Sequence, residues 1–238
     1  MPLILLPLMA FFTAALSGTI GFGGAILLLP VLTATLGVAK AVPLLTFIQI
    51  VGNASRVIFA NSEINWSAAK SFLITGVPFS ILGALSFVAA PKAIMLKLIG
   101  VAILVFIALK LLGFTKGQIS KKGLPVAGAV IGFLSGLLGT AGPLGAAVFM
   151  SMNMPPLMYI STDAFSSLVM HTAKAIVYHP TTTSDFAGLS LLTIVMSVTT
   201  ILGTLVGNKI AKKIPQDLFR HAVTALIAIV AIQMVFSA

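Results

Sequence analysis

The sequence predicts an all-α polytopic membrane protein made of two inverted-topology repeats, each with a Gly-broken or re-entrant helix. The chain of 238 residues is 59% hydrophobic and only 8% charged, whereas a soluble domain carries about 25% charged residues. Its apolar runs are long enough for helices that cross a hydrocarbon core of ~30 Å. They are continuous rather than alternating, which argues against a transmembrane barrel. A glycine-rich interruption of the first run recurs in the second half.

The first apolar run is divided by the stretch Gly18–Gly24 into a first arm, Pro2–Ser17, and a second arm, Ala25–Leu36. Neither arm is long enough for an upright crossing at 1.5 Å per residue. They are therefore tilted partial spans or a re-entrant hairpin. In lipid such a break survives only where protein or a cavity satisfies the backbone polar groups. The run lacks a basic leader, so we expect a retained span rather than a signal peptide.

The remaining apolar runs complete two repeats. Spans are predicted over 41–60, 67–90 and 93–114, with Trp66 as an interfacial anchor. The second half has arms 124–138 and 143–152, then spans 157–178, 186–208 and 217–236. We thus predict a first repeat over 1–114, a basic cytoplasmic linker over 115–123 and a second repeat over 124–238.

The two halves correspond at an offset of 118 residues. At this offset Gly18, Gly21 and Gly24 match Gly136, Gly139 and Gly142, and Arg56 matches Lys174. Beyond a short insertion the offset is 120, and Gly83 matches Gly203. The ungapped register from the glycines to the basic pair is the strongest indication of a repeat.

Basic residues predict the orientation of the halves. Lys116–Lys122 and Lys209–Lys213 are the two basic clusters, and the positive-inside rule puts both on the cytoplasmic side. An even number of crossings then separates them, so each half crosses an odd number of times and the halves have opposite topology. Lys92 and Lys97 fall on the other side. The net charge of +10 is thus explained by membrane topology, and no nucleic-acid partner is expected.

Polar side chains lie on one face of two predicted spans. The span 41–60 carries Gln49, Asn53 and Arg56, and the span 157–178 carries Asp163, Ser167, His171, Lys174 and Tyr178. These spacings place each set on one helix face. An ionisable residue inside hydrocarbon is costly and by default indicates function. We therefore expect the two stripes to converge on one site near the membrane midplane.

Each stripe residue also has a plainer interpretation. Arg56, Lys174 and Tyr178 lie near helix ends, where long side chains snorkel to the interface. Asn53 and His171 lie deeper, and their plainer role is a hydrogen bond between helices. Both interpretations stand for Arg56 and Lys174, whereas the functional one is favoured for Asn53 and His171.

The charges indicate an anionic substrate. The stripes contain two cations and one acid, and each helix that begins after a break offers free N–H groups and a positive dipole end. The predicted substrate-binding residues are Gly21, Gly23, Gly24, Gln49, Asn53, Arg56, Gly139, Gly142, Ser167, His171 and Lys174. Asp163 and His171 can change protonation state and are candidates for proton coupling. For Asp163, which follows Ser161-Thr162, a helix N-cap role is the alternative.

Other chemistry is not indicated. The chain has no cysteine, four acidic residues and three histidines, which argues against a metal site or another cofactor. No nucleophile–base–orienter set is present, so an enzyme is not expected. Gly83, Gly203 and Gly207 are interpreted as small residues that let helices approach closely.

The glycine punctuation resembles a known family. Gly21-Phe22-Gly23-Gly24 leading to Pro30, and Gly52-Asn53-Ala54-Ser55-Arg56 leading to Glu63-Ile64-Asn65-Trp66, look like the first-repeat signature of the TauE/SafE sulfite exporter family. Gly132 to Gly139, followed by Ser161-Thr162-Asp163, is similar to its second repeat. The second break departs from the family, which has a run of glycines where this chain has Thr140-Ala141-Gly142-Pro143-Leu144-Gly145. It is stiffer, because Pro143 has a fixed φ and no N–H. The resemblance implies a permease of the cytoplasmic (inner) membrane for sulfite, sulfonates or related anions.

Residues and resemblance together predict a secondary membrane transporter that exports a small organosulfur or organic anion by alternating access, with Asp163 and His171 as the candidates for proton coupling. Its partners are then the anion and the lipid bilayer, and a homodimer is one assembly considered. The alternative is a membrane scaffold or accessory subunit that does not transport, with glycines used only for helix packing.

Overall fold

The computed structural model describes residues 5–20, 24–59, 63–111, 119–140, 142–182 and 190–210. Helices account for nearly all of these residues, and no strand occurs among them. The elements are α1 (Leu5–Ile20), α2 (Gly24–Leu36), α3 (Val38–Phe59), α4 (Trp66–Ala89), α5 (Lys92–Leu111), the 3₁₀ turn η2 (Lys121–Gly123), α6 (Leu124–Leu138), α7 (Gly142–Met150), α8 (Pro156–Thr182) and α9 (Ser190–Ile210). The predicted span 217–236 and residues 115–118 of the predicted linker lie outside the described residues.

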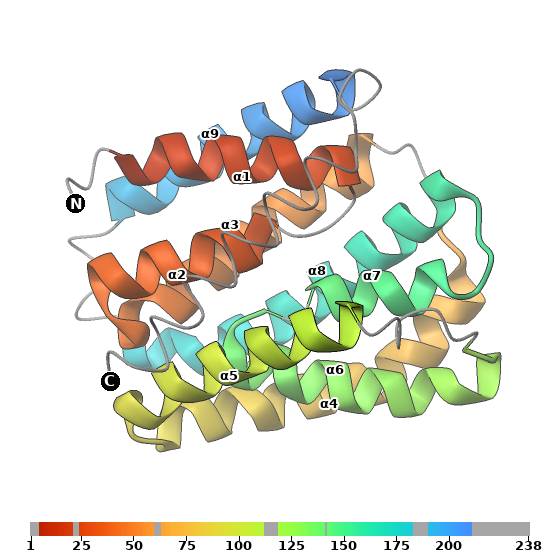
Figure 1. Cartoon of the computed structure of the whole chain (residues 1–238), viewed down its shortest axis with the longest axis horizontal. Helices are drawn as coiled ribbons and strands as arrows, with labels where there is room; N and C mark the ends of the chain where they lie inside the picture. Colours follow the sequence, from red (N-terminus) through yellow and green to blue (C-terminus); the bar gives the residue numbers. More distant parts are fainter. Residues whose placement is uncertain are drawn as a thin grey trace.

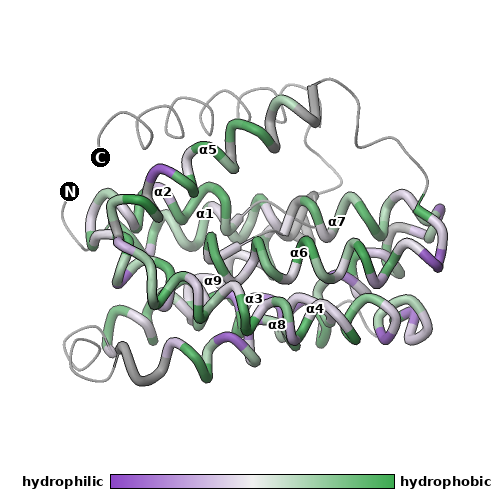
Figure 2. Tube along the Cα trace, turned by 90° about the horizontal axis from the view of Figure 1, so that it is seen from below, coloured by the Kyte–Doolittle hydropathy of each residue, from purple (hydrophilic) through white to green (hydrophobic). Residues whose placement is uncertain are grey.

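The helices have the length and composition of membrane spans. Four are long and apolar enough to cross a bilayer: Val38–Ile58, Trp66–Ala89, Lys121–Leu138 and Ser190–Gly207. Shorter apolar helices occupy Leu5–Ser17, Gly24–Leu36 and Ala93–Ala102. Hydrophobic residues predominate along the trace (Figure 2), and many large ones, such as Ile74, Ile176 and Leu191, are exposed. An apolar outer surface suits a lipid solvent, so the prediction of an all-α polytopic membrane protein is confirmed.

Both predicted breaks are present, and helices resume at matching glycines. α1 ends at Ile20 and α2 begins at Gly24, whereas α6 ends at Leu138 and α7 begins at Gly142. Gly139 ends α6 with a φ of 85°, a left-handed conformation that glycine adopts without strain. Gly21 and Gly23 lie outside the described residues.

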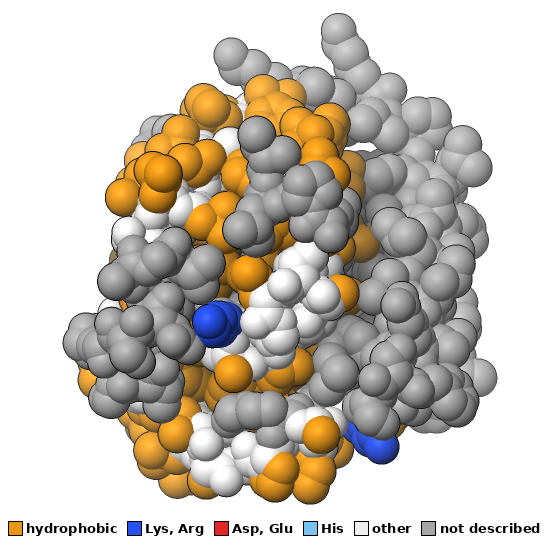
Figure 3. Space-filling view, turned by 90° about the vertical axis from the view of Figure 1, so that its left-hand side faces the viewer, with side chains coloured by type: hydrophobic (Ala, Val, Ile, Leu, Met, Phe, Trp, Pro, Cys, Tyr) orange, Lys and Arg blue, Asp and Glu red, His pale blue; other side chains and the backbone are white. Residues whose placement is uncertain are grey.

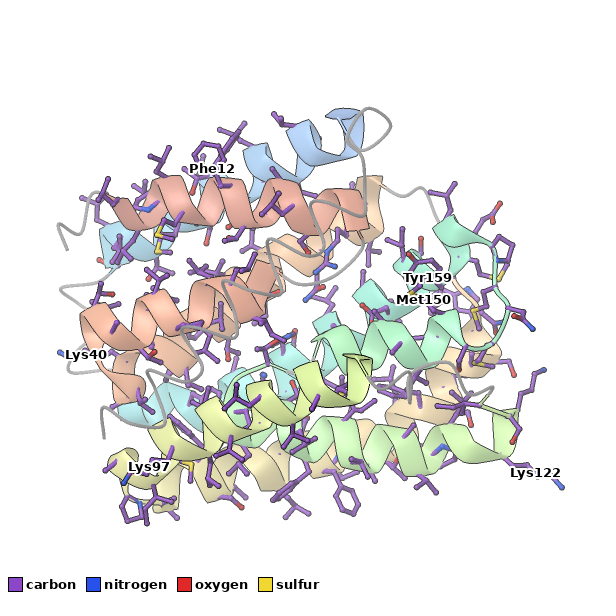
Figure 4. The ribbon with its side chains drawn as sticks, in the orientation of Figure 1. Phe12, Lys40, Lys97, Lys122, Met150 and Tyr159 are labelled. Atoms are coloured by element: carbon purple, nitrogen blue, oxygen red, sulfur yellow. The ribbon has the colours of Figure 1, made fainter. Side chains whose placement is uncertain are left out.

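The two short helices after the breaks run in opposite directions. Lys40, just beyond α2, lies at one end of the bundle, whereas Met150, the last residue of α7, lies toward the other (Figure 4). Their first residues, Gly24 and Gly142, line the same cavity. The helix after the first break, α2, thus runs toward one end of the molecule, and the helix after the second break, α7, runs toward the other.

Helices of the two halves interlock at glycines. α4 packs along α6, and α1 packs along α9 (Figure 1). A Cβ added at Gly83 of α4 would lie 2.1 Å from the Phe133 carbonyl oxygen of α6. A Cβ at Gly203 or Gly207 of α9 would lie 2.2 Å or 2.1 Å from a carbonyl oxygen of α1. Only glycine permits such approaches, which confirms the predicted packing role of these three residues.

Among the described helices, the main packing pairs keep the same pattern when the halves are exchanged in the register of the predicted repeat. In the register of the repeat, α1 corresponds to α6 and α4 to α9, so the pair α4–α6 becomes α9–α1. α3 and α8, which carry the polar stripes, correspond to each other and pack together. The contacts between α4 and α8 likewise correspond to those between α9 and α3. The halves therefore build one bundle with α3 and α8 at its centre.

Basic residues mark the two ends of the bundle. Lys122 and the C-terminal end of α9 lie at one end, and Lys40 and Lys97 at the other (Figures 1 and 4). Among the described residues on the face at the latter end, hydrophobic side chains are prominent, and the charged groups in view are Lys or Arg (Figure 3). The lysines therefore fall at the ends that the repeat scheme predicts, and the cytoplasmic placement of the first end stays a prediction.

Candidate binding site between the two helix breaks

A cavity lies where the two breaks meet the two polar stripes. We call it the central cavity, and it is lined by Ser17, Gly24, Ala25, Gln49, Asn53, Arg56, Thr140, Gly142, Asp163, Ser167 and His171. The space open to the centre of a water-sized sphere is about 20 Å³, which is about what a single water needs. As described, the cavity therefore has room for about one water molecule.

Two helix N-termini face the central cavity. Gly24 and Gly142 are the first residues of α2 and α7, and both line it. The first turn of a helix has N–H groups without intrahelical partners and the positive end of the helix dipole. A Cβ at Gly24 would lie 2.7 Å from the Thr13 carbonyl oxygen, so glycine is needed for α2 to begin this close to α1. The arrangement provides two converging sets of donors for a negative charge.

Arg56 and Asp163 bring opposite charges to this cavity. The Arg56 Nη2 donates to the Asn53 Oδ1 at 2.6 Å, and the guanidinium and the Asp163 carboxylate attract each other. A Cβ at Gly145 would lie 2.7 Å from the Asp163 Oδ1, so this glycine makes room for the carboxylate. The N-cap alternative for Asp163 is wrong, because α8 begins well before it, at Pro156.

His171 carries a polar atom without a partner. Its side chain is only 5% exposed, and the Nδ1 has no hydrogen-bond partner among the described residues. Buried polar atoms are almost always paired, and an exception calls for a ligand, a water or strain. Because His171 lines the cavity, its Nδ1 is available to a molecule bound there.

Lys174 and Tyr178 bind backbone carbonyls at the second break instead. The Lys174 Nζ donates to the carbonyl oxygens of Ser135 and Gly139, both at 2.8 Å, and to the Ser135 Oγ at 3.0 Å. The Tyr178 hydroxyl donates to the Gly136 carbonyl oxygen. Both side chains are 0% exposed, so the snorkelling interpretation is wrong for them. They satisfy carbonyls that the end of α6 leaves unpaired, and the cation suits the negative end of its dipole.

Most of the predicted substrate-binding set thus lines one cavity. Gly24, Gln49, Asn53, Arg56, Gly142, Ser167 and His171, together with Asp163, do so, whereas Gly139 and Lys174 do not. Ser17 and Thr140 line it without having been predicted. Only their positions in the sequence could have indicated them, because Ser17 immediately precedes the first glycine cluster and Thr140 lies inside the second. No group of three or more metal-ligating side chains was found among the described residues.

The family model described as Sulfite exporter TauE/SafE matches residues 6–234. The chain belongs to the sulfite exporter TauE/SafE family. A match over nearly the whole chain makes this TauE/SafE protein a multi-pass membrane protein of the sulfite-exporter type, and the family is one of transporters rather than enzymes. No curated protein and no solved structure matches it.

Proposed function

We propose that the protein is a secondary transporter that exports a small anion, sulfite or a related organosulfur or organic anion, across the cytoplasmic (inner) membrane. One observation carries the proposal. The N-termini of α2 and α7 meet at a cavity that also holds Arg56 and the unpartnered Nδ1 of His171. Each of these groups favours a negative ligand or can donate to one.

Alternating access is the mechanism that this arrangement favours. α2 and α7 come from different halves and run to opposite ends (Figure 4), and the packing pairs are exchanged with the halves. Both features support inverted repeats, in which one half rocks against the other around a fixed site. A cavity with room for about one water must open to admit an anion, so binding is coupled to a conformational change.

Asp163 gives the site a means of proton coupling. In the described structure its carboxylate attracts Arg56, the same group that a substrate anion would contact. An anion entering beside an ionised carboxylate meets repulsion, and protonation of Asp163 removes it. His171, on the same face of α8, is the second group that can exchange a proton. One proton would then accompany the anion.

Lys174 acts in this proposal as a positioning residue. Its ammonium holds the end of α6 at Ser135 and at Gly139, and Gly139 directly precedes Thr140, two residues before the start of α7. The N-terminus of α7 is thereby fixed at the cavity.

Purified protein tests the proposal directly. A thermal-shift screen against sulfite, sulfate, thiosulfate, sulfonates and carboxylates should show one class that raises the unfolding temperature by mass action. Proteoliposomes that contain only this protein should then transport that anion. Binding without transport would favour the scaffold or accessory subunit, and neither binding nor transport of any of these anions would contradict the proposal.

A further inference from the structure

A second cavity adjoins the first on the side of α1 and α9. We call it the hydroxyl chamber, because Thr13, Ser17, Thr200 and Thr204 line it, together with Gly52. It shares Ser17, Gly24, Gln49 and Arg56 with the central cavity. The two spaces are therefore contiguous at Arg56 and at the N-terminus of α2.

One hydroxyl of the chamber lacks a partner. Thr13 donates to the Ala10 carbonyl oxygen at 3.2 Å, and Thr204 donates to that of Thr200 at 2.9 Å. The Thr200 side chain is only 7% exposed, and its Oγ1 has no partner among the described residues. A buried hydroxyl left unpaired is unfavourable, so Thr200 has a proton to donate to a molecule in the chamber.

The corresponding place in the second half is filled. In the register of the repeat, Thr13 and Gly52 match Ile131 and Met170, which are 5% and 3% exposed members of one apolar cluster. Ser17 matches Ser135, which there receives the ammonium of Lys174. The fold thus packs this place with side chains in one half and leaves it hollow and polar in the other. Helix packing alone does not require the hollow.

The chamber leads away from the break in a definite direction. On α1 the lining residues are Ser17, then Thr13 and Ala10, each about one turn closer to the N-terminus of the helix. On α2 they are Gly24 and Leu28, one turn closer to the C-terminus of that helix. Both lead toward the end of the bundle where α2 ends near Lys40 (Figure 4). This end lies opposite the basic cluster at Lys122 and so is predicted to face away from the cytoplasm.

We propose that the hydroxyl chamber is a second binding station for a small oxyanion, on its way between the central cavity and the end of the bundle near Lys40. This inference rests on the proposed transport function. The station holds the anion by the Thr200 hydroxyl, the N-terminus of α2 and Arg56, which contacts both spaces. Asp163 lines the central cavity and not the chamber, so an anion that moves across leaves the carboxylate behind. Export proceeds from the acid-bearing cavity to the hydroxyl chamber.

Thr200→Val tests the station with almost no change of volume. Because the hydroxyl has no partner in the protein, its removal should leave the unfolding temperature of the free protein unchanged or raise it. Loss of a hydrogen bond to a charged ligand should lower the rate of radiolabelled sulfite transport in proteoliposomes by about 10-fold. Thr35→Val on α2 is the matched control, since its hydroxyl donates to the Val31 and Leu32 carbonyl oxygens outside both cavities. Its transport rate should equal that of the wild type.

Gly52→Val tests the same station from the opposite wall. A Cβ at Gly52 would lie 3.1 Å from the Thr200 Cγ2, so the larger side chain narrows the chamber. Transport of sulfite should fall, while equilibrium binding of sulfite to the purified protein stays within about 3-fold of the wild type, a difference below 1 kcal/mol. Met170→Leu, at the matching position of the second half, is a volume-conserving control that should leave transport unchanged.

The outcomes separate the two proposals. If the wild type transports sulfite and both chamber variants match it, the station is refuted and the transport function stands. If Gly52→Val loses binding together with transport, the chamber is part of the central site and not a second station. If Thr35→Val lowers the rate of sulfite transport as much as Thr200→Val does, the loss reflects a general effect of replacing a buried threonine, and the station is again refuted. If the wild type neither binds nor transports sulfite, the parent proposal fails for this anion.

Discussion

Replacement of Lys174 by methionine is expected to destabilise the protein more than it weakens anion binding. The ammonium donates to three acceptors, two of which are the carbonyl oxygens of Ser135 and Gly139, each at 2.8 Å. Methionine keeps the length of the side chain but leaves these carbonyls without their donor in the bundle interior. Each orphaned acceptor costs about 1–3 kcal/mol, so the two together set an upper range of about 2–6 kcal/mol.

Two effects lower that range. Hydrogen bonds between membrane helices contribute about 0.6 kcal/mol on average, and removal of the cation also removes its desolvation penalty. We therefore expect a loss of about 2–3 kcal/mol in the free energy of unfolding. Tyr178→Phe, which removes a single donor to Gly136, should cost about 1 kcal/mol. The double variant should show coupling, because both side chains hold the same helix end.

The assay is reversible unfolding in detergent micelles, followed by helical circular dichroism, beside equilibrium binding of sulfite at a temperature where each variant is folded. Arg56→Met is the comparison, since Arg56 lines the central cavity and its loss should act mainly on binding. If Lys174→Met is as stable as the wild type but binds sulfite at least 10-fold more weakly, a purely structural role of Lys174 at the end of α6 is refuted. That result would make Lys174 a ligand, as its place on the α8 stripe predicts from sequence.

Other predictions follow from single contacts. In Asp163→Asn, sulfite transport should no longer respond to an imposed pH gradient while exchange of sulfite across the membrane persists; an unchanged response in proteoliposomes would exclude Asp163 from coupling. Gly136→Ala should strongly reduce the yield of folded protein, because a Cβ there would lie 2.1 Å from the Ser80 carbonyl oxygen; normal yield and unfolding temperature would contradict this close packing. Gly145→Val should displace the Asp163 carboxylate, whose Oδ1 would lie 2.7 Å from the new Cβ; sulfite affinity equal to that of the wild type would show that the carboxylate position is unimportant.

The sequence predicted the breaks and most of the residues that line the central cavity, because glycine clusters and helical spacing are local features of the chain. Glycine clusters interrupt helices wherever they occur, and the offset of 118 residues paired Gly24 with Gly142, the residues at which α2 and α7 begin. Helical spacing placed Asn53 and Arg56 on one face of α3, and His171 on one face of α8. A tertiary contact between those faces then sufficed to form the central cavity.

The different hydrogen-bond partners of Arg56 and Lys174 could not be predicted from the sequence. They occupy matching positions, yet one donates to Asn53 and the other to carbonyls at the end of α6. Which partner each basic side chain reaches depends on the distance between neighbouring helices, and no local sequence pattern specifies that distance. The hydroxyl chamber was missed for the same reason, since Thr13 and Thr200 come from opposite ends of the chain and meet only because α1 packs along α9.

Binding of sulfite to the purified wild type and to Arg56→Met is the most direct test of the account. In the proposed site a small anion binds at the N-termini of α2 and α7, beside this guanidinium. The wild type should bind sulfite, and the variant should bind it about 10–100-fold more weakly, the worth of a hydrogen bond to a charged group, with an unfolding temperature close to that of the wild type. Equal affinities in two folded proteins would contradict the account.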